Sequence, residues 1–193
     1  MVAILVLGVG IVAAGTPARG VVVADVSEVL NRNVAIVDPS TLPPIEVGQD
    51  VLDFDPLLDS AGMQPIVVTL SQNLELENQA LLRHDASLLT EVDHGDRLDE
   101  MRGRLHDAIA SGTVTISHFR IEAIHVSLLL PFGQQSGLSL GLASRGTVVE
   151  QTYDASGQLR SSRTKPFSLT FVVRRALGAR WLNVAVLPPK SSG

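Results

Sequence analysis

The amino-acid sequence predicts an α+β fold in which helices near the amino terminus pack on one face of a curved antiparallel sheet. First, apolar and polar side chains alternate over long spans between residues 137 and 188, as at Leu169, Phe171 and Val173. This period of two is typical of strands that bury one face. Second, residues 71–111 carry apolar side chains at helical spacing instead. Helices followed by a run of antiparallel strands form the α+β pattern.

Composition divides the 193 residues into four parts. Residues 1–24 form an apolar segment that we expect to be a membrane anchor or a signal segment, and residues 25–70 form an acidic linker that contains proline. Residues 71–188 form the α+β domain, and residues 189–193 form a short tail. A chain of this length can bury a hydrophobic core of ordinary size.

The amino-terminal segment leaves two interpretations open. Residues 2–14 are uncharged and apolar, with small residues near Ala14 and Ala18 that resemble a signal-peptide cleavage site, although no Lys or Arg precedes them. Together, residues 2–24 are long enough to cross a bilayer if Arg19 lies at its surface. The alternative is a pair of buried strands, residues 2–12 and 20–26. An anchor or signal would place the rest of the chain outside the cytoplasm.

Residues 25–70 show no sustained hydrophobic period. They contain five prolines and eight acidic residues, with Arg32 as their one base. Because proline cannot donate to a sheet ladder, we expect an extended spacer that holds the domain away from a surface. Its apolar side chains leave open that it packs on the domain or on a partner. Residues 66–70 are the part expected to be ordered and to enter the fold.

The formal charge of −5 and the absence of cysteine limit the classes of function. Without cysteine, disulfides, thiolate chemistry and cysteine-held zinc are excluded. Basic residues gather in the last strands, but the acidic total and the lack of aromatic residues between them argue against nucleic-acid binding.

Three helices are predicted between residues 71 and 112. The first begins at an N-cap, Ser71, and ends near residue 83; the second covers residues 86–92 and is capped by Asp85. The third is capped by Asp96 and ends before Gly112, a residue suited to helix termination. Its charged residues are expected to face water: Asp99, Glu100, Arg102, Arg104 and Asp107.

After Gly112 the hydrophobic period changes to two. Residues 113–122 and 124–130 form one long bent strand or two strands, which end at a proline at position 131. Residues 134–137 then turn the chain into a meander of long strands, with a second turn at residues 154–157.

Four stretches resemble a known family: residues 80–89 (ALLRHDASLL), 146–150 (GTVVE), 166–174 (PFSLTFVVR) and 180–184 (RWLNV). In these stretches and in the order of its elements, the chain resembles the cone-shaped nuclear-transport-factor-2-like superfamily over about residues 71–188. It resembles in particular membrane-tethered extracytoplasmic members, such as Mce-associated proteins and the domain shared by the mitochondrial import-motor docking subunit and plastid-division proteins. The resemblance implies a cone-like α+β domain but no single activity, because enzymes, binders and scaffolds share this fold.

The enzymes of that superfamily work inside the cone, and an isomerase of this kind needs a carboxylate base and a neutral donor. The candidates in this chain are Asp85, Glu122, Glu150 and Tyr153. Glu150 and Tyr153 are three positions apart, so on a regular strand they point to opposite faces, which argues against a shared site. We therefore predict no catalytic residues and a protein that is not an enzyme.

The sequence also predicts no metal site and no cofactor. The five histidines lack the four-residue helical spacing of a metalloprotease. The pairs His84-Asp85 and Asp93-His94 could hold a metal only if the fold brought them together. The glycine-rich residues 133–141 precede a strand rather than a helix, so they do not form a phosphate-binding loop.

Three residues are candidates for contacting a ligand or a partner: Arg145, Tyr153 and Trp181. If Arg145 points inward, it can hold a carboxylate of a ligand or a partner; if outward, it is solvated, and a β-bulge at Gly146 decides between the two. Tyr153 lies at the end of a predicted hairpin. Trp181 is the sole tryptophan and starts the last strand, where it closes the core or lies at the rim of a binding site.

Taken together, the sequence predicts a non-enzymatic, membrane-tethered extracytoplasmic module for assembly or protein recognition in a larger envelope complex. The alternative is a pocket protein that binds or isomerises a small apolar ligand, and a third interpretation is a subunit whose first 70 residues run along another protein. The interior of the cone discriminates between the first two. Leu, Phe and Val side chains around two or three convergent polar groups favour ligand binding, whereas a filled interior favours a scaffold.

Overall fold

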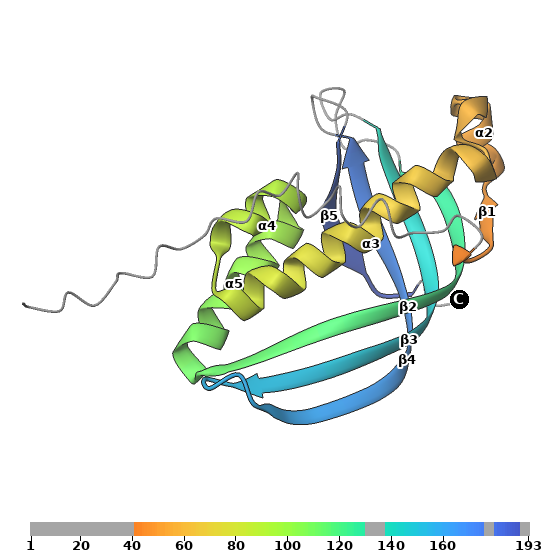
Figure 1. The fold of residues 1–193 in the computed structure, drawn as a ribbon. Helices are drawn as coiled ribbons and strands as arrows, with labels where there is room; N and C mark the ends of the chain where they lie inside the picture. The colour runs from red at the N-terminus through yellow and green to blue at the C-terminus, as the bar shows by residue number, and fades with distance from the viewer. Residues whose placement is uncertain (1–40, 130–137, 176–179, 190–193) are drawn as a thin grey trace, which may run out of the picture.

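The computed structural model describes residues 41–129, 138–175 and 180–189 (Figure 1). The helical elements are α2 (Gln49–Phe54), the 3-10 helix η2 (Pro56–Leu58), α3 (Ser60–Arg83), α4 (Ala86–Val92) and α5 (Asp96–Ser111). The strands are β1 (Ile45–Val47), β2 (Thr113–Leu129), β3 (Ser139–Asp154), β4 (Leu159–Arg175) and β5 (Trp181–Leu187). The predicted apolar segment 1–24, the turn at residues 134–137 and most of the tail lie outside the described residues.

The fold is α+β, and its five strands form one open mixed sheet in the order β1-β2-β3-β4-β5. The strands β2 to β5 pair with their sequence neighbours in antiparallel fashion, which confirms the predicted meander. The sequence did not indicate β1, which pairs with β2 in parallel, Ile45 lying opposite Ile124. None of the helices in the described ranges has the length and apolar character that a membrane crossing requires.

The expected long bent strand is β2, and its irregularity lies at Glu122. The register with β3 shifts between Ile121 and Ala123, which leaves Glu122 as the extra residue of a bulge. Gly146 lies opposite this bulge, and a Cβ atom there would collide with the carbonyl group of Arg120. The bulge therefore needs glycine at position 146 for close backbone approach.

Over residues 45–70 the structure differs from the extended linker that was expected for residues 25–70, of which residues 25–40 lie outside the described part of the chain. From residue 45 onward the chain forms β1, α2, η2 and the first turns of α3, which begins at Ser60 and not at Ser71. Asp59 caps α3 by accepting a hydrogen bond from the Gly62 N–H group at 2.8 Å. Pro65 lies inside the helix and lacks the N–H group of a helical hydrogen bond. Burial of apolar side chains at helical spacing stabilises the helix by more than this bond would. The buried residues are Met63, Ile66, Val67 and Leu70.

The two shorter helices lie almost where the sequence places them. α4 spans Ala86–Val92, and Asp85 caps it through the Ser87 N–H group at 2.9 Å. α5 begins at Asp96 itself, with Gly95 in the N-cap position, and ends before Gly112, whose φ is +64°. Positive φ at Gly112 is the left-handed conformation that commonly ends a helix.

The hydrophobic core has two parts, and α3 contributes to both. Its first half packs on the sheet in a cluster that includes Leu70, Leu142 and Phe171. Its second half packs with α4, α5 and the start of β2 around Leu89 and Met101. Figure 1 shows α3 crossing the concave side of the sheet, with α4 and α5 at one end. A group of buried polar residues, among them Asn73 and Glu77, lies where these two cores meet.

Candidate functional site

Polar residues of α3 separate the two hydrophobic cores. Asn73, Glu77 and Asn78 are almost completely buried, and they lie between Leu70 and Ala80 on the helix. Burying such groups is costly unless each finds a hydrogen-bond partner. Their partners come from α5, β2 and β5, so the polar residues link α3 to three other elements.

Glu77 forms a buried ion pair with Arg97 of α5. Arg97 Nε donates to Glu77 Oε1 at 3.0 Å, and a second bond joins Arg97 Nη2 to Glu77 Oε2. The third guanidinium nitrogen, Nη1, donates to Glu100 Oε2 at 2.8 Å. Burial alone would lower the pKa of Arg97, but Glu77 and then Glu100 outweigh it and hold that pKa above its ordinary value. Arg97 is therefore charged at neutral pH.

Asparagine side chains attach the same helix to strands on either side. Asn183 of β5 donates through Nδ2 to Glu77 Oε1 at 2.9 Å, and Asn73 Nδ2 donates to the carbonyl oxygen of Trp181 at 3.0 Å. On the other side, Asn78 donates to the Ser117 carbonyl oxygen and accepts from the Ser117 N–H group, both at 3.0 Å. These bonds fix α3 against β5 and β2.

Asp93 is a second buried acid in this region, only 1% exposed. The side chains that act on its carboxyl group are those of Glu77, Arg97 and Asn183. Burial, and then the negative charge of Glu77, raise its pKa from the ordinary value of 3.8 to about 9. Asp93 is therefore protonated at neutral pH and adds no charge to the region.

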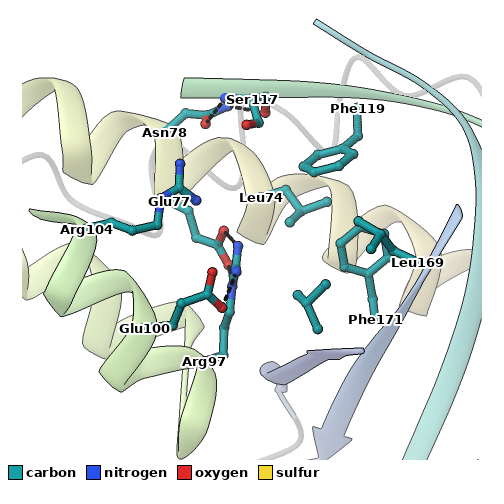
Figure 2. A pocket seen from close by; sticks show the side chains of 11 residues that line it. Leu74, Glu77, Asn78, Arg97, Glu100, Arg104, Ser117, Phe119, Leu169 and Phe171 are labelled. Carbon is teal, nitrogen blue, oxygen red and sulfur yellow. Dashed lines mark hydrogen bonds and ion pairs between the residues drawn. The ribbon is translucent and has the colours of Figure 1, made fainter. Parts of the chain in front are cut away.

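A cavity of about 160 Å³ opens beside the ion pair, between α3, α5 and the sheet (Figure 2). One side of it is polar and is formed by Glu77, Asn78, Arg97, Glu100, Arg104 and Ser117. The other side is apolar and is formed by Leu74, Phe119, Leu169, Phe171 and Val186. We call this cavity the concave pocket.

The aromatic residues of the apolar side pack edge to face. The ring centre of Phe119 lies 5.1 Å from that of Phe167 and 5.4 Å from that of Phe171. A wider groove of about 380 Å³ borders the pocket along β4, and both include Ser117, Phe119 and Leu169. The concave pocket thus combines an apolar surface for a hydrocarbon group with several fixed polar groups.

The three residues predicted to bind a ligand or partner do not lie together in the structure. Arg145 is exposed on β3 while its neighbour Ser144 is buried, so Arg145 points away from the interior. Tyr153 packs on the second core and donates to Gln151 Oε1 at 3.0 Å, whereas Trp181 packs on the first core. None of the three lines the concave pocket. Their role in binding stays a prediction.

The acidic residues considered for acid–base chemistry lie outside the concave pocket. Asp85 caps α4, Glu122 is exposed, and Glu150 pairs with Lys165 Nζ at 2.7 Å. The possible pairing of His84 with His94 for a metal gains no support, since no group of three or more candidate ligands converges within the described ranges.

Sequence patterns did not indicate the residues that form the polar side of the concave pocket. The helical pattern predicted that Arg104 faces water, whereas Arg104 lines the pocket. One signal was available: Asn73 and Glu77 are four residues apart in an apolar helix, so they share a face with Leu70. Polar residues on a buried helix face indicate a polar cluster.

Comparisons with known proteins do not identify the chain. No protein-family model matches it, and neither does any curated protein. Among solved structures, the intermembrane space region of the chloroplast protein ARC6 is similar, with 15% identity and a TM-score of 0.48. The match covers 67% of this chain and 97% of that chain. Similarity of this degree assigns no function.

Replacing Asp93 with Asn is expected to flatten the pH dependence of stability. The folded state of the wild type keeps a proton that the unfolded chain releases above about pH 4, so the free energy of unfolding falls as pH rises toward about 9. The slope cannot exceed about 1.4 kcal/mol per pH unit for one proton. Asn has no proton to lose, so the variant gains stability over the wild type as pH rises.

Denaturant unfolding at pH 5, 6, 7 and 8 measures this difference. Asp107→Asn, an exposed change on α5, is the control and should follow the wild type. Parallel pH profiles for Asp93→Asn and the wild type would show that Asp93 does not hold a proton inside the fold.

Proposed function

We propose that this domain is a binding module that takes a small ligand into the concave pocket. The observation that supports the proposal is the pocket itself: about 160 Å³ beside Leu, Phe and Val side chains, with polar groups converging from α3 and α5. Small-molecule sites are usually hollows of this kind, largely apolar with a few placed polar groups. A filled interior would have favoured a scaffold.

Binding fits the pocket better than proton-transfer catalysis, because its buried acid is already engaged. Glu77 accepts two hydrogen bonds from Arg97 and one from Asn183. Glu100 is the other carboxylate of the pocket, and it is bound to Arg97. Asp93 is protonated and does not line the pocket. A general base must reach the proton it removes, and a carboxylate held in an ion pair is a weak candidate.

We propose, in addition, the superfamily to which this α+β domain belongs. We place the domain in the cone-shaped nuclear-transport-factor-2-like superfamily, near its Mce-associated members. Support comes from helices that precede long antiparallel strands and from a hollow on the side of the sheet that α3 crosses. It also comes from the four sequence stretches that resemble the superfamily.

We also propose that the domain is tethered to a membrane on its extracytoplasmic side and recognises a protein partner in a larger envelope complex. The apolar sequence of residues 1–24 supports the tether. Exposed apolar side chains support a partner: Phe54 of α2 is 60% exposed and Leu57 of η2 is 81% exposed. Neighbouring apolar side chains on a surface often mark an interaction site.

Leu169→Trp is expected to weaken ligand binding at least about tenfold, because the larger ring occupies the pocket. Leu187→Trp is the matched control: the same change at a more exposed position on β5, 44% exposed and outside the pocket. Ligand-observed NMR with toluene, cyclohexanol and 2-phenylethanol measures binding by the wild type and both variants. Binding of these compounds to Leu169→Trp as tightly as to the wild type would contradict the proposed ligand site.

Fractionation of cells that express the full chain is expected to recover it with membranes, and added protease should digest the carboxyl-terminal domain from the extracytoplasmic side. A chain that lacks residues 1–24 should instead stay in the soluble fraction. Recovery of the intact full chain from the cytosol would contradict the tether and would leave the pocket proposal unaffected.

A further inference from the structure

In the described part of the chain, the guanidinium group of Arg104 lines the concave pocket without forming an ion pair. Arg104 Nη2 donates to the carbonyl oxygen of Thr115 at 3.1 Å, and Nη1 makes a long contact of 3.5 Å with Met101 Sδ. Among the described residues, no carboxylate oxygen forms an ion pair with Arg104, whereas Arg97 pairs with two glutamates. Because a guanidinium has five N–H donors, Arg104 keeps about three of them for another acceptor.

The surroundings of Arg104 favour an anion. Arg97 and Arg104 are seven residues apart, so both point from the same side of α5 toward α3. Burial, and then the positive charge of Arg97, lower the pKa of Arg104, and the charges of Glu77, Glu100 and Glu150 offset only part of this effect. Figure 2 shows its side chain reaching toward Glu77 and Asn78, on the polar side of the pocket. A negative group placed there would replace the water that burial has removed and offset the repulsion between the two arginines.

The carboxylates already present do not fill this role. Glu77 is bound by Arg97 and Asn183, and Glu100 has a side chain 49% exposed and bound to Arg97. An added carboxylate can therefore meet Arg104 without breaking either ion pair. Arg–carboxylate pairs are commonly bidentate, which fixes orientation as well as adding energy.

The apolar side of the pocket limits the size of the ligand. An apolar cavity of about 150 Å³ takes up benzene, and the concave pocket has about 160 Å³. Phe119, Leu169 and Phe171 provide the surface for one ring. The adjoining groove along β4 leaves room for a substituent on that ring.

We propose that the ligand is a cyclic or aromatic monocarboxylic acid of about the size of phenylacetate. Its carboxylate binds Arg104, and its ring lies against Phe119 and Phe171. This inference rests on the proposed function, since it names the ligand of the same pocket.

Phenylacetate and phenylacetamide form the test pair, because they differ little in size and only the first is charged. Calorimetric titration of the full chain is expected to give an affinity at least about tenfold higher for phenylacetate. Arg104→Gln should bring the two affinities together. Arg102→Gln removes the same charge from an exposed position on α5 and should preserve the preference.

The outcomes separate this inference from the proposed function. Equal affinities of the wild type for the acid and the amide, or binding of neutral compounds alone, would overturn the carboxylate assignment and leave the ligand site standing. If neither charged nor neutral compounds bind, both proposals fail. If Arg104→Gln does not fold, the comparison of phenylacetate with phenylacetamide on the wild type decides the carboxylate assignment, and Leu169→Trp decides only whether the ligand lies in the concave pocket.

Discussion

The buried ion pair between Glu77 and Arg97 is the interaction on which the packing of helices against the sheet depends. Two charges removed from water are tolerated only when geometry and further hydrogen bonds compensate for the lost hydration. Here the pair has two bonds between its members, one from Asn183 and one to Glu100. These bonds join α3, α5 and β5: α3 and α5 cannot separate without leaving a buried charge unpaired, and β5 cannot move away without removing a hydrogen bond from Glu77.

The same ion pair explains why the domain has a hollow beside it. Side chains that would otherwise fill this space are polar and are held in place by their partners, as Asn78 is by Ser117. The sheet supplies an apolar surface opposite them, through Phe119 and Phe171. Glu77 and Glu100, the carboxylates of the pocket, both accept hydrogen bonds from Arg97. Arg104 is the pocket residue that keeps N–H donors for a further acceptor. Under the binding role that we propose, Arg104 is the group that meets the ligand.

Sequence patterns predicted the parts of the fold that depend on interactions between residues close in sequence. The order of the antiparallel strands and the bounds of α4 follow from side-chain alternation and from the capping residue Asp85. The start of α3 was missed because Pro65 signals a break, whereas burial of Met63 and its neighbours overrides it. The site was missed because Glu77, Arg97 and Asn183 are distant in sequence and meet only after folding. The helical period shows which residues of α5 share a face, but not which of these faces contacts α3 and the pocket.

A double-mutant cycle at Glu77 and Arg97 tests most directly whether this pair holds the domain together. The free energy of unfolding is measured by denaturant titration at pH 7 for the wild type, Glu77→Gln, Arg97→Met and the double variant. We expect each single change to cost about 3–5 kcal/mol and the double change to cost less than their sum by about 2 kcal/mol or more. Exposed ion pairs typically contribute less than about 1 kcal/mol. If each single change lowered the free energy of unfolding by less than this, and the two losses were additive, the central role of this interaction would be contradicted.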